Sequence, residues 1–246
     1  MSCLDKHHIL EIEDLSVSFT QYEKGLRQIE LPVISKLHVS VHTGEIVAVV
    51  GSSGSGKSLL AHAVLGLLPN NANVRGRIFF NEELLDPEKI KNLRGKEISL
   101  VPQSVNYLDP LMKVGPQVRQ GHKDQKTIQR QKKLFRHYDL DETTEGLFPF
   151  ELSGGMARRV LLSSAMMEAP QLIIADEPTP GLHLEMAKKA MEHFRAFADA
   201  GNGVLLITHD IELALEVADR IAVFYAGTTV EEAKVDDFDC EGTLRH

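Results

Sequence analysis

The residues best suited to bind phosphate lie in one short stretch, 51–58. It has the spacing G-x-x-x-x-G-K-[ST], which ends in Lys57 and Ser58. Glycines let the backbone aim successive N–H groups at phosphate oxygens, and a helix that begins near Lys57 adds the positive end of its dipole. We expect Lys57 to reach the β- and γ-phosphates of ATP and Ser58 to bind Mg²⁺. The predicted nucleotide-binding residues of this loop are Gly51, Ser52, Ser53, Gly54, Ser55, Gly56, Lys57 and Ser58.

A pair of acids, Asp176 and Glu177, could complete such a site. They follow the apolar run 172–175, which is typical of a strand buried on both faces. Such a strand has little reason to end in two acids unless they face a cation or water. We expect Asp176 to serve the metal ion and Glu177 to polarise the attacking water. The structural alternative is a strand end that is merely solvated.

A second anion site is indicated at Ser153, Gly154 and Gly155, directly before the helical pattern 157–162. One nucleotide does not need two phosphate sites in one chain. The surplus therefore suggests that the second site serves a nucleotide held by another molecule. Ser-Gly-Gly before a helix is also a common cap, so both interpretations stay open.

The elements that must position these residues alternate in type. Segment 9–19 alternates apolar and polar residues in two pieces and 37–41 does so again, as half-buried strands do. Nearly continuous apolar runs predict buried parallel strands at 45–50, 171–176 and 203–208. Helical patterns follow them, for example at 59–68, stopped by Pro69, and at 211–218. Strands that alternate with helices predict an α/β domain with a mainly parallel sheet.

The middle of the chain differs from this pattern. Residues 88–160 are richer in Lys, Gln and Arg, show helical periodicity around 128–138, and contain one clear strand at 98–101. We interpret this segment as a helical insertion. The prediction is a single domain, 1–246, whose α/β core comprises 1–87 and 161–246.

The bulk composition narrows the class of protein. The net charge of −8 disfavours a nucleic-acid partner, because such proteins usually carry a basic face. Cys3 and Cys240 lack metal-like spacing and fit incidental thiols in a reducing cytosol. The first residues lack a secretory signal, and no stretch approaches the roughly 18 apolar residues of a membrane span. A role at a membrane would therefore require a partner.

Taken in order, these strings resemble the ATP-binding cassette (ABC) ATPases over nearly the whole chain. Walker A corresponds to 51–58, the signature to 152–156 and Walker B to 172–177. The resemblance implies a P-loop NTPase core with a mainly parallel sheet, an N-terminal antiparallel β subdomain and a helical insertion. It also implies ATP and Mg²⁺ as ligands.

The resemblance assigns further residues. Gln103 is similar to the Q-loop glutamine, which in the family touches Mg²⁺ and senses the transmembrane partner. His209 is similar to the switch histidine that contacts the γ-phosphate. Phe19 corresponds to the aromatic residue that stacks on adenine, with Tyr22 as the alternative.

Finer strings are similar to the oligopeptide, dipeptide and nickel importer ATPases. They are 103–112, 148–151 and 218–227. In that group two different ATPase subunits lie beneath two membrane subunits. The resemblance implies a peripheral protein at the cytoplasmic face of the cell membrane, a head-to-tail nucleotide sandwich with a second, non-identical cassette, two permease subunits, and indirectly an extracytoplasmic binding protein.

Two stretches depart from the family pattern. His183 stands where the family has the D-loop aspartate, which couples the two sites of a dimer. After the signature, family glutamines are replaced by Ala157 and Arg158, while Arg159 matches. We expect His183 to affect mainly the nucleotide site of the partner, because the family's D-loop acts on that site.

The predicted function is an ATPase that powers an importer of peptides or nickel chelates. One alternative is a soluble ABC protein that acts on nucleic acid or ribosomes, which the acidic charge disfavours. Another is a regulatory cassette that binds ATP with little hydrolysis, which His183 keeps open.

Overall fold

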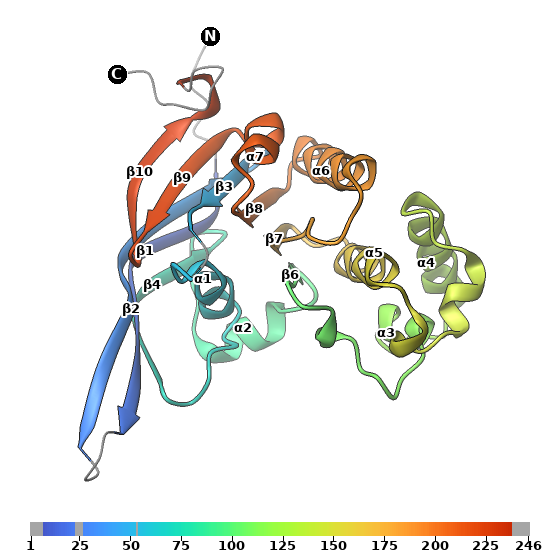
Figure 1. Cartoon of the computed structure of the whole chain (residues 1–246), viewed down its shortest axis with the longest axis horizontal. Coiled ribbons are helices and arrows are strands. Elements are labelled where there is room, and N and C mark those ends of the chain that lie inside the picture. Colours follow the sequence, from blue (N-terminus) through green and yellow to red (C-terminus); the bar gives the residue numbers. More distant parts are fainter. Residues whose placement is uncertain (1–6, 23–26, 53, 238–246) are drawn as a thin grey trace.

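The computed structural model describes residues 7–22, 27–52 and 54–237, so Cys3, Ser53 and Cys240 lie outside the described residues. Its first sheet is antiparallel with strand order β2-β1-β4-β5 (Figure 1). These strands are β1 His8–Tyr22, β2 Gln28–His42, β4 Ala72–Phe80 and β5 Glu83–Leu84.

The second sheet carries the loop 51–58 and the two acids that the sequence singled out. Within the described residues it has the order β10-β9-β3-β8-β7-β6, and every neighbouring pair is parallel except β10 with β9. The strands are β3 Ile46–Val50, β6 Ile98–Val101, β7 Leu172–Asp176, β8 Gly203–Thr208, β9 Arg220–Tyr225 and β10 Thr228–Lys234. The predicted α/β fold with a mainly parallel sheet and an antiparallel β subdomain is confirmed.

Helices cover both faces of the parallel sheet because its central strands are buried on both sides. Along β3, Val47 and Val49 pack into a core shared with α1 and the antiparallel sheet. Ile46 and Ala48 pack into a second core with α6 and α7. The helices are α1 Lys57–Val64, α2 Pro87–Leu93, α3 Val114–Val118, α4 Gln125–His137, α5 Gly154–Ala165, α6 Leu184–Asp199 and α7 Ile211–Val217.

Four short 3₁₀ turns complete the described elements. They are η1 Val105–Tyr107, η2 Glu142–Gly146, η3 Pro149–Glu151 and η4 Val235–Asp237. Helices α3, α4 and α5 share a separate apolar cluster and lie at the opposite end of the molecule from the antiparallel strands (Figure 1). Strand β6, from the same middle segment of the chain, instead forms an edge of the parallel sheet. The limits of the helical insertion stay a prediction.

Helix α1 is shorter than its apolar pattern predicts. It ends at Val64, and Gly66 follows with φ +60°. The N–H groups of Leu67 and Gly66 donate to the carbonyls of His62 and Ala63 at 2.8 and 3.2 Å. These two bonds form a Schellman motif, which closes the helix before Pro69 is reached.

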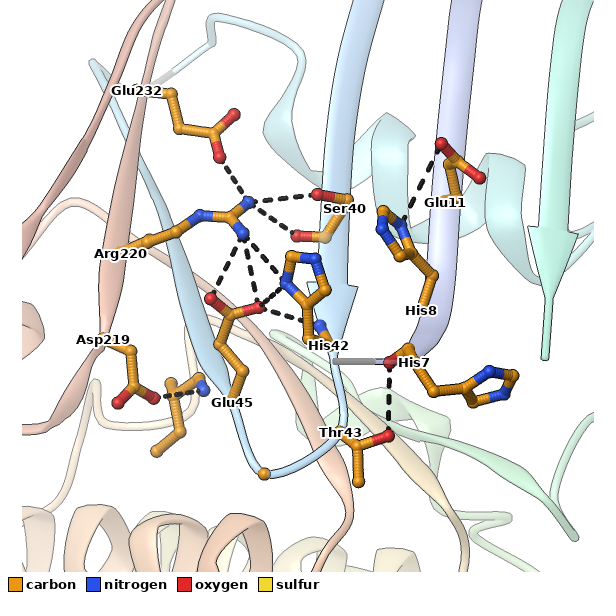
Figure 2. Close-up of polar contacts among 12 residues, drawn as sticks. His7, His8, Glu11, Ser40, His42, Thr43, Glu45, Asp219, Arg220 and Glu232 are labelled. Carbon is orange, nitrogen blue, oxygen red and sulfur yellow. Dashed lines mark hydrogen bonds and ion pairs between the residues drawn. The ribbon is translucent and has the colours of Figure 1, made fainter. Parts of the chain in front are cut away.

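A polar network joins the two sheets at the end of β3 opposite to the loop 51–58. Arg220, at the start of β9, lies between β2 and the residue that precedes β3 (Figure 2). Its guanidinium donates to Glu45 at 3.2 Å and to the Ser40 carbonyl at 3.0 Å, and it also pairs with Glu232. Glu45 in turn accepts from the His42 N–H at 2.8 Å. The network fixes the antiparallel sheet relative to β3.

No helix in the part of the chain that the structure describes combines the length and the hydrophobicity needed to span a membrane.

Candidate nucleotide-binding site

The loop that follows β3 is shaped to receive an anion. Gly56 forms the N-cap of α1 with φ +99°, a conformation that only glycine adopts easily, and no described side chain caps the helix. The first N–H groups of α1 therefore stay available to a ligand. The buried Ser55 hydroxyl has no hydrogen-bond partner among the described residues. A phosphate group would satisfy these donors.

Close packing fixes the start of the loop. A Cβ atom added at Gly51 would lie 2.2 Å from the Phe224 carbonyl oxygen on β9. Only glycine allows this approach, so β9 supports the loop from behind.

Lys57 projects into the loop. Its Nζ donates to the carbonyls of Gly51 and Ser52 at 2.6 and 2.9 Å. Burial lowers the pKa of this ammonium, while Glu177 and Asp176 act in the opposite sense. The cation is thus held by neutral carbonyls and remains suited to pair with phosphate.

Oxygen ligands for a cation lie at the base of the loop. Ser58 Oγ donates to Asp176 Oδ1 at 3.1 Å, although the two residues are 118 positions apart in sequence. Burial raises the pKa of Asp176; Glu177 also raises it and Ser58 lowers it. A hydroxyl and a carboxylate are ligands that Mg²⁺ prefers, and a dication would oppose the effect of burial. The donor set therefore fits Mg²⁺.

Glu177 pairs with His209 because β7 and β8 are neighbouring parallel strands. His209 Nδ1 lies 2.9 and 2.8 Å from the two carboxylate oxygens of Glu177. The Glu177 side chain is 8% exposed, whereas that of His209 is 62% exposed. Glu177 has φ +47°, an uncommon backbone conformation of the kind found at functional sites. The pair presents a buried carboxylate beside a histidine that solvent can reach.

Six of the predicted residues line one cavity of about 270 Å³, whereas His209 lines a separate one. The first cavity is lined by Val33, Gly54, Gly56, Lys57, Ser58, Leu59, Gln103 and Glu177. Sequence reasoning missed Val33, on β2, and Leu59, on α1, because neither is a fixed position of a motif. Phe19 instead packs against the apolar core, and Tyr22 is 65% exposed with its hydroxyl 2.8 Å from Gln28. The adenine-stacking assignment stays a prediction.

The signature residues lie apart from this cavity. Ser153 is the N-cap of α5, and its Oγ accepts from the Met156 N–H at 3.2 Å. Ser153 and Gly155 line a different cavity of about 450 Å³, together with Gly181 and His183. Gly154 is exposed. Within one chain the two predicted anion sites are therefore not brought together.

A parallel sheet that places a phosphate-binding loop beside paired acids defines a P-loop nucleotide-binding domain. The chain belongs to the ABC transporter family, whose sequence profile matches residues 34–180. It is 35% identical over 251 residues to the oligopeptide transport ATP-binding protein OppD of Lactococcus lactis subsp. cremoris, covering 95% of this chain and 72% of that protein. It is 33% identical over 238 residues to the dipeptide transport ATP-binding protein DppD of Bacillus subtilis, covering 91% and 70%.

Solved structures share this fold. A dimeric bacterial ABC transporter cassette has a TM-score of 0.79 at 24% identity, covering 92% of this chain and 98% of that one. A dimeric cassette in a post-hydrolysis state, bound to ADP and phosphate, has a TM-score of 0.78 at 26% identity with the same coverage.

Proposed function

We propose that this chain is the ATP-hydrolysing subunit that powers an ABC importer of peptides. The observation that carries the proposal is the assembly of Lys57, Ser58, Asp176 and Glu177 at one loop. The printed functions of the relatives, oligopeptide and dipeptide transport, support peptides over nickel chelates as the cargo.

Each residue of the site has its own role in binding or hydrolysis. Lys57 and the first N–H groups of α1 bind and orient the phosphates. Ser58 and Asp176, with Gln103 at the cavity wall, would hold Mg²⁺, which neutralises phosphate charge when bound. Glu177 accepts a proton from the attacking water, and His209 orients the Glu177 carboxylate.

The active unit in this proposal is a head-to-tail dimer with a second cassette. Ser153, Gly154 and Gly155 then contact a nucleotide held by the partner, because they lie apart from this chain's own phosphate loop. His183 lines the same cavity as the signature and supports a non-identical partner, since it places an imidazole where an aspartate is expected. The dimer acts at the cytoplasmic face of the membrane, beneath two permease subunits that receive substrate from a binding protein.

Substitution of Glu177 by glutamine tests this function. Glu177→Gln keeps the shape of the site but removes the proton acceptor, so ATP turnover should fall by about 10²–10⁴-fold while ATP binding persists. ATP-dependent dimers, measured by size-exclusion chromatography, should accumulate. Glu192→Gln, on the exposed face of α6, is the matched control and should behave as wild type.

A second variant, Lys57→Ala, should lose nucleotide affinity. Normal turnover in Glu177→Gln would refute the role of Glu177. Absence of ATP hydrolysis by the wild-type chain together with its partner cassette would refute the proposed function.

A further inference from the structure

Arg158, one of the two departures that follow the signature, is a buried cation. It lies one turn inside α5 and is 5% exposed. Its Nη1 donates to the Pro102 carbonyl at 2.6 Å, and its Nη2 donates to the Gln103 carbonyl at 2.5 Å. Two prongs of one rigid guanidinium therefore clamp consecutive backbone carbonyls directly after β6.

The electrostatic setting shows that this clamp is not a solvated surface contact. Burial lowers the pKa of Arg158, and Asp176 and Glu177 act in the opposite sense. The guanidinium thus lies within electrostatic range of both acids at the end of β7. Its Nε is buried without a hydrogen-bond partner among the described residues. A cation kept in such a place needs fixed acceptors, and the two carbonyls supply them.

The clamp connects two parts of the site that are otherwise separate. At one end, the Gln103 side chain lines the phosphate-loop cavity with Lys57 and Glu177. At the other end, α5 begins at the signature, where Ser153 lines the second cavity. The guanidinium joins these ends through two direct hydrogen bonds.

We propose that Arg158 is a positioning residue that ties Gln103 to the signature helix, so that a nucleotide engaged by Ser153 and Gly155 sets the position of Gln103 in this chain's own site. The inference rests on the proposed function, because it assigns one pathway by which the two sites of a dimer communicate. A glutamine at this position, as the family pattern leads one to expect, offers one amide group and no charge. Arg158 makes the link stronger and bidentate.

The neighbouring arginines provide contrast. Arg159 donates to the Asp139 carbonyl at 2.7 Å and so ties α5 to the end of α4. Arg130 is exposed and donates to the Met166 carbonyl at the other end of α5, at 2.9 Å. Arg130 is the matched control, because its guanidinium likewise ties α5 to another segment through a backbone carbonyl but lines neither cavity.

The test compares Arg158→Met, Arg158→Gln and Arg130→Met in steady-state ATPase assays with the partner cassette. For Arg158→Met we expect kcat to fall on the order of tenfold, because a displaced group next to the chemistry slows the reaction. The dissociation constant for a fluorescent ATP analogue should stay within about twofold of wild type, because the loop that binds phosphate is intact. The kcat of Arg158→Gln should lie between those of Arg158→Met and wild type. The kcat of Arg130→Met should match that of wild type.

A double-mutant cycle separates positioning from general structural damage. If Arg158 acts through Gln103, then Arg158→Met should have no further effect on kcat once Gln103→Ala is present. Additive losses in the cycle would overturn the proposal. So would wild-type kcat in Arg158→Met, or equal losses in Arg130→Met.

Hydrogen exchange, measured without nucleotide, gives a readout that does not depend on catalysis. Arg158→Met should speed exchange at the amides of 103–107 on the order of tenfold, while β3 and β8 stay protected. Unchanged exchange at 103–107 would overturn the clamp even if the wild-type chain hydrolyses ATP. If Arg158→Met does not fold, the same comparison is made with Arg158→Gln. If the wild-type chain fails to hydrolyse ATP, that result counts against the proposed function. The hydrogen-exchange comparison then still tests whether Arg158 holds the segment 103–107.

Discussion

Replacing Arg220 by methionine removes the cation that joins the two sheets and should destabilise the whole domain. The substitution retains the length and apolar surface of the side chain, so the change is chiefly one of charge and hydrogen bonding. Arg220 is 15% exposed and Glu45 is 5% exposed, which makes this a buried ion pair. Without Arg220, the Glu45 carboxylate stays buried with His42 as its neighbour.

The magnitude follows from what Glu45 retains. Removing one partner of a buried ion pair costs about 3–5 kcal/mol, because it leaves an uncompensated charge. Glu45 keeps the His42 N–H at 2.8 Å and the His42 ring nitrogen at 2.6 Å, which places the expected loss at the lower end. We expect the free energy of unfolding to fall by about 3 kcal/mol and Tm by roughly 6–12 °C.

Urea denaturation followed by circular dichroism measures the effect. Arg77→Met is the control, because the Arg77–Glu13 pair is 64% and 32% exposed and should contribute less than about 1 kcal/mol. Adding Glu45→Gln to Arg220→Met should restore part of the stability, because the unpaired charge is then gone. The reasoning is wrong if Arg220→Met unfolds within about 0.5 kcal/mol of wild type, or if the losses of the two substitutions simply add.

Two further outcomes follow from the geometry. Gly51→Ala should lower ATP affinity by at least about tenfold in a binding titration, because the new Cβ would lie 2.2 Å from the Phe224 carbonyl oxygen. Gly146→Ala is the control in the same titration, because no atom lies within 4 Å of a Cβ at that position. His193, whose pKa burial and then His137 lower from 6.5 to about 4, accepts the Tyr138 hydroxyl proton only when neutral. The unfolded chain therefore binds this proton more readily, and the free energy of unfolding should fall as pH drops from about 6.5 to about 4. In urea titrations, His193→Gln should flatten that fall between about pH 6.5 and about pH 4, and an unchanged slope would contradict the assignment.

Local sequence was sufficient to predict the phosphate loop and the buried strands around it. The run 45–50 and the glycines of 51–58 encode a strand, a turn and a helix start within a few residues, so their backbone geometry depends little on the rest of the chain. The alternating pattern of 9–19 also predicted two pieces, and β1 has a register shift between Ile12 and Leu15, beside Asp14 with φ +51°. The predicted end of α1 was wrong, because Gly66 closes the helix before Pro69.

Tertiary structure decided which of these residues meet. Glu177 and His209 are 32 positions apart, and Ser58 and Asp176 are 118 apart, so only the order of parallel strands brings each pair into contact. No local sequence motif marks Val33 as part of the cavity wall or Arg158 as the residue that clamps 102–103. Their positions depend on the register between β1 and β2 and on the packing of α5 against β6.

The sequence by itself predicted a phosphate-binding loop, its place in the chain, and the acids that would complete the site. Only the fold decided that the signature faces a separate cavity and that Arg158 connects it to Gln103. The physical reason is that a motif specifies backbone conformation over a few residues. Contact between distant motifs is instead selected by burial of the apolar strands and helices that carry them.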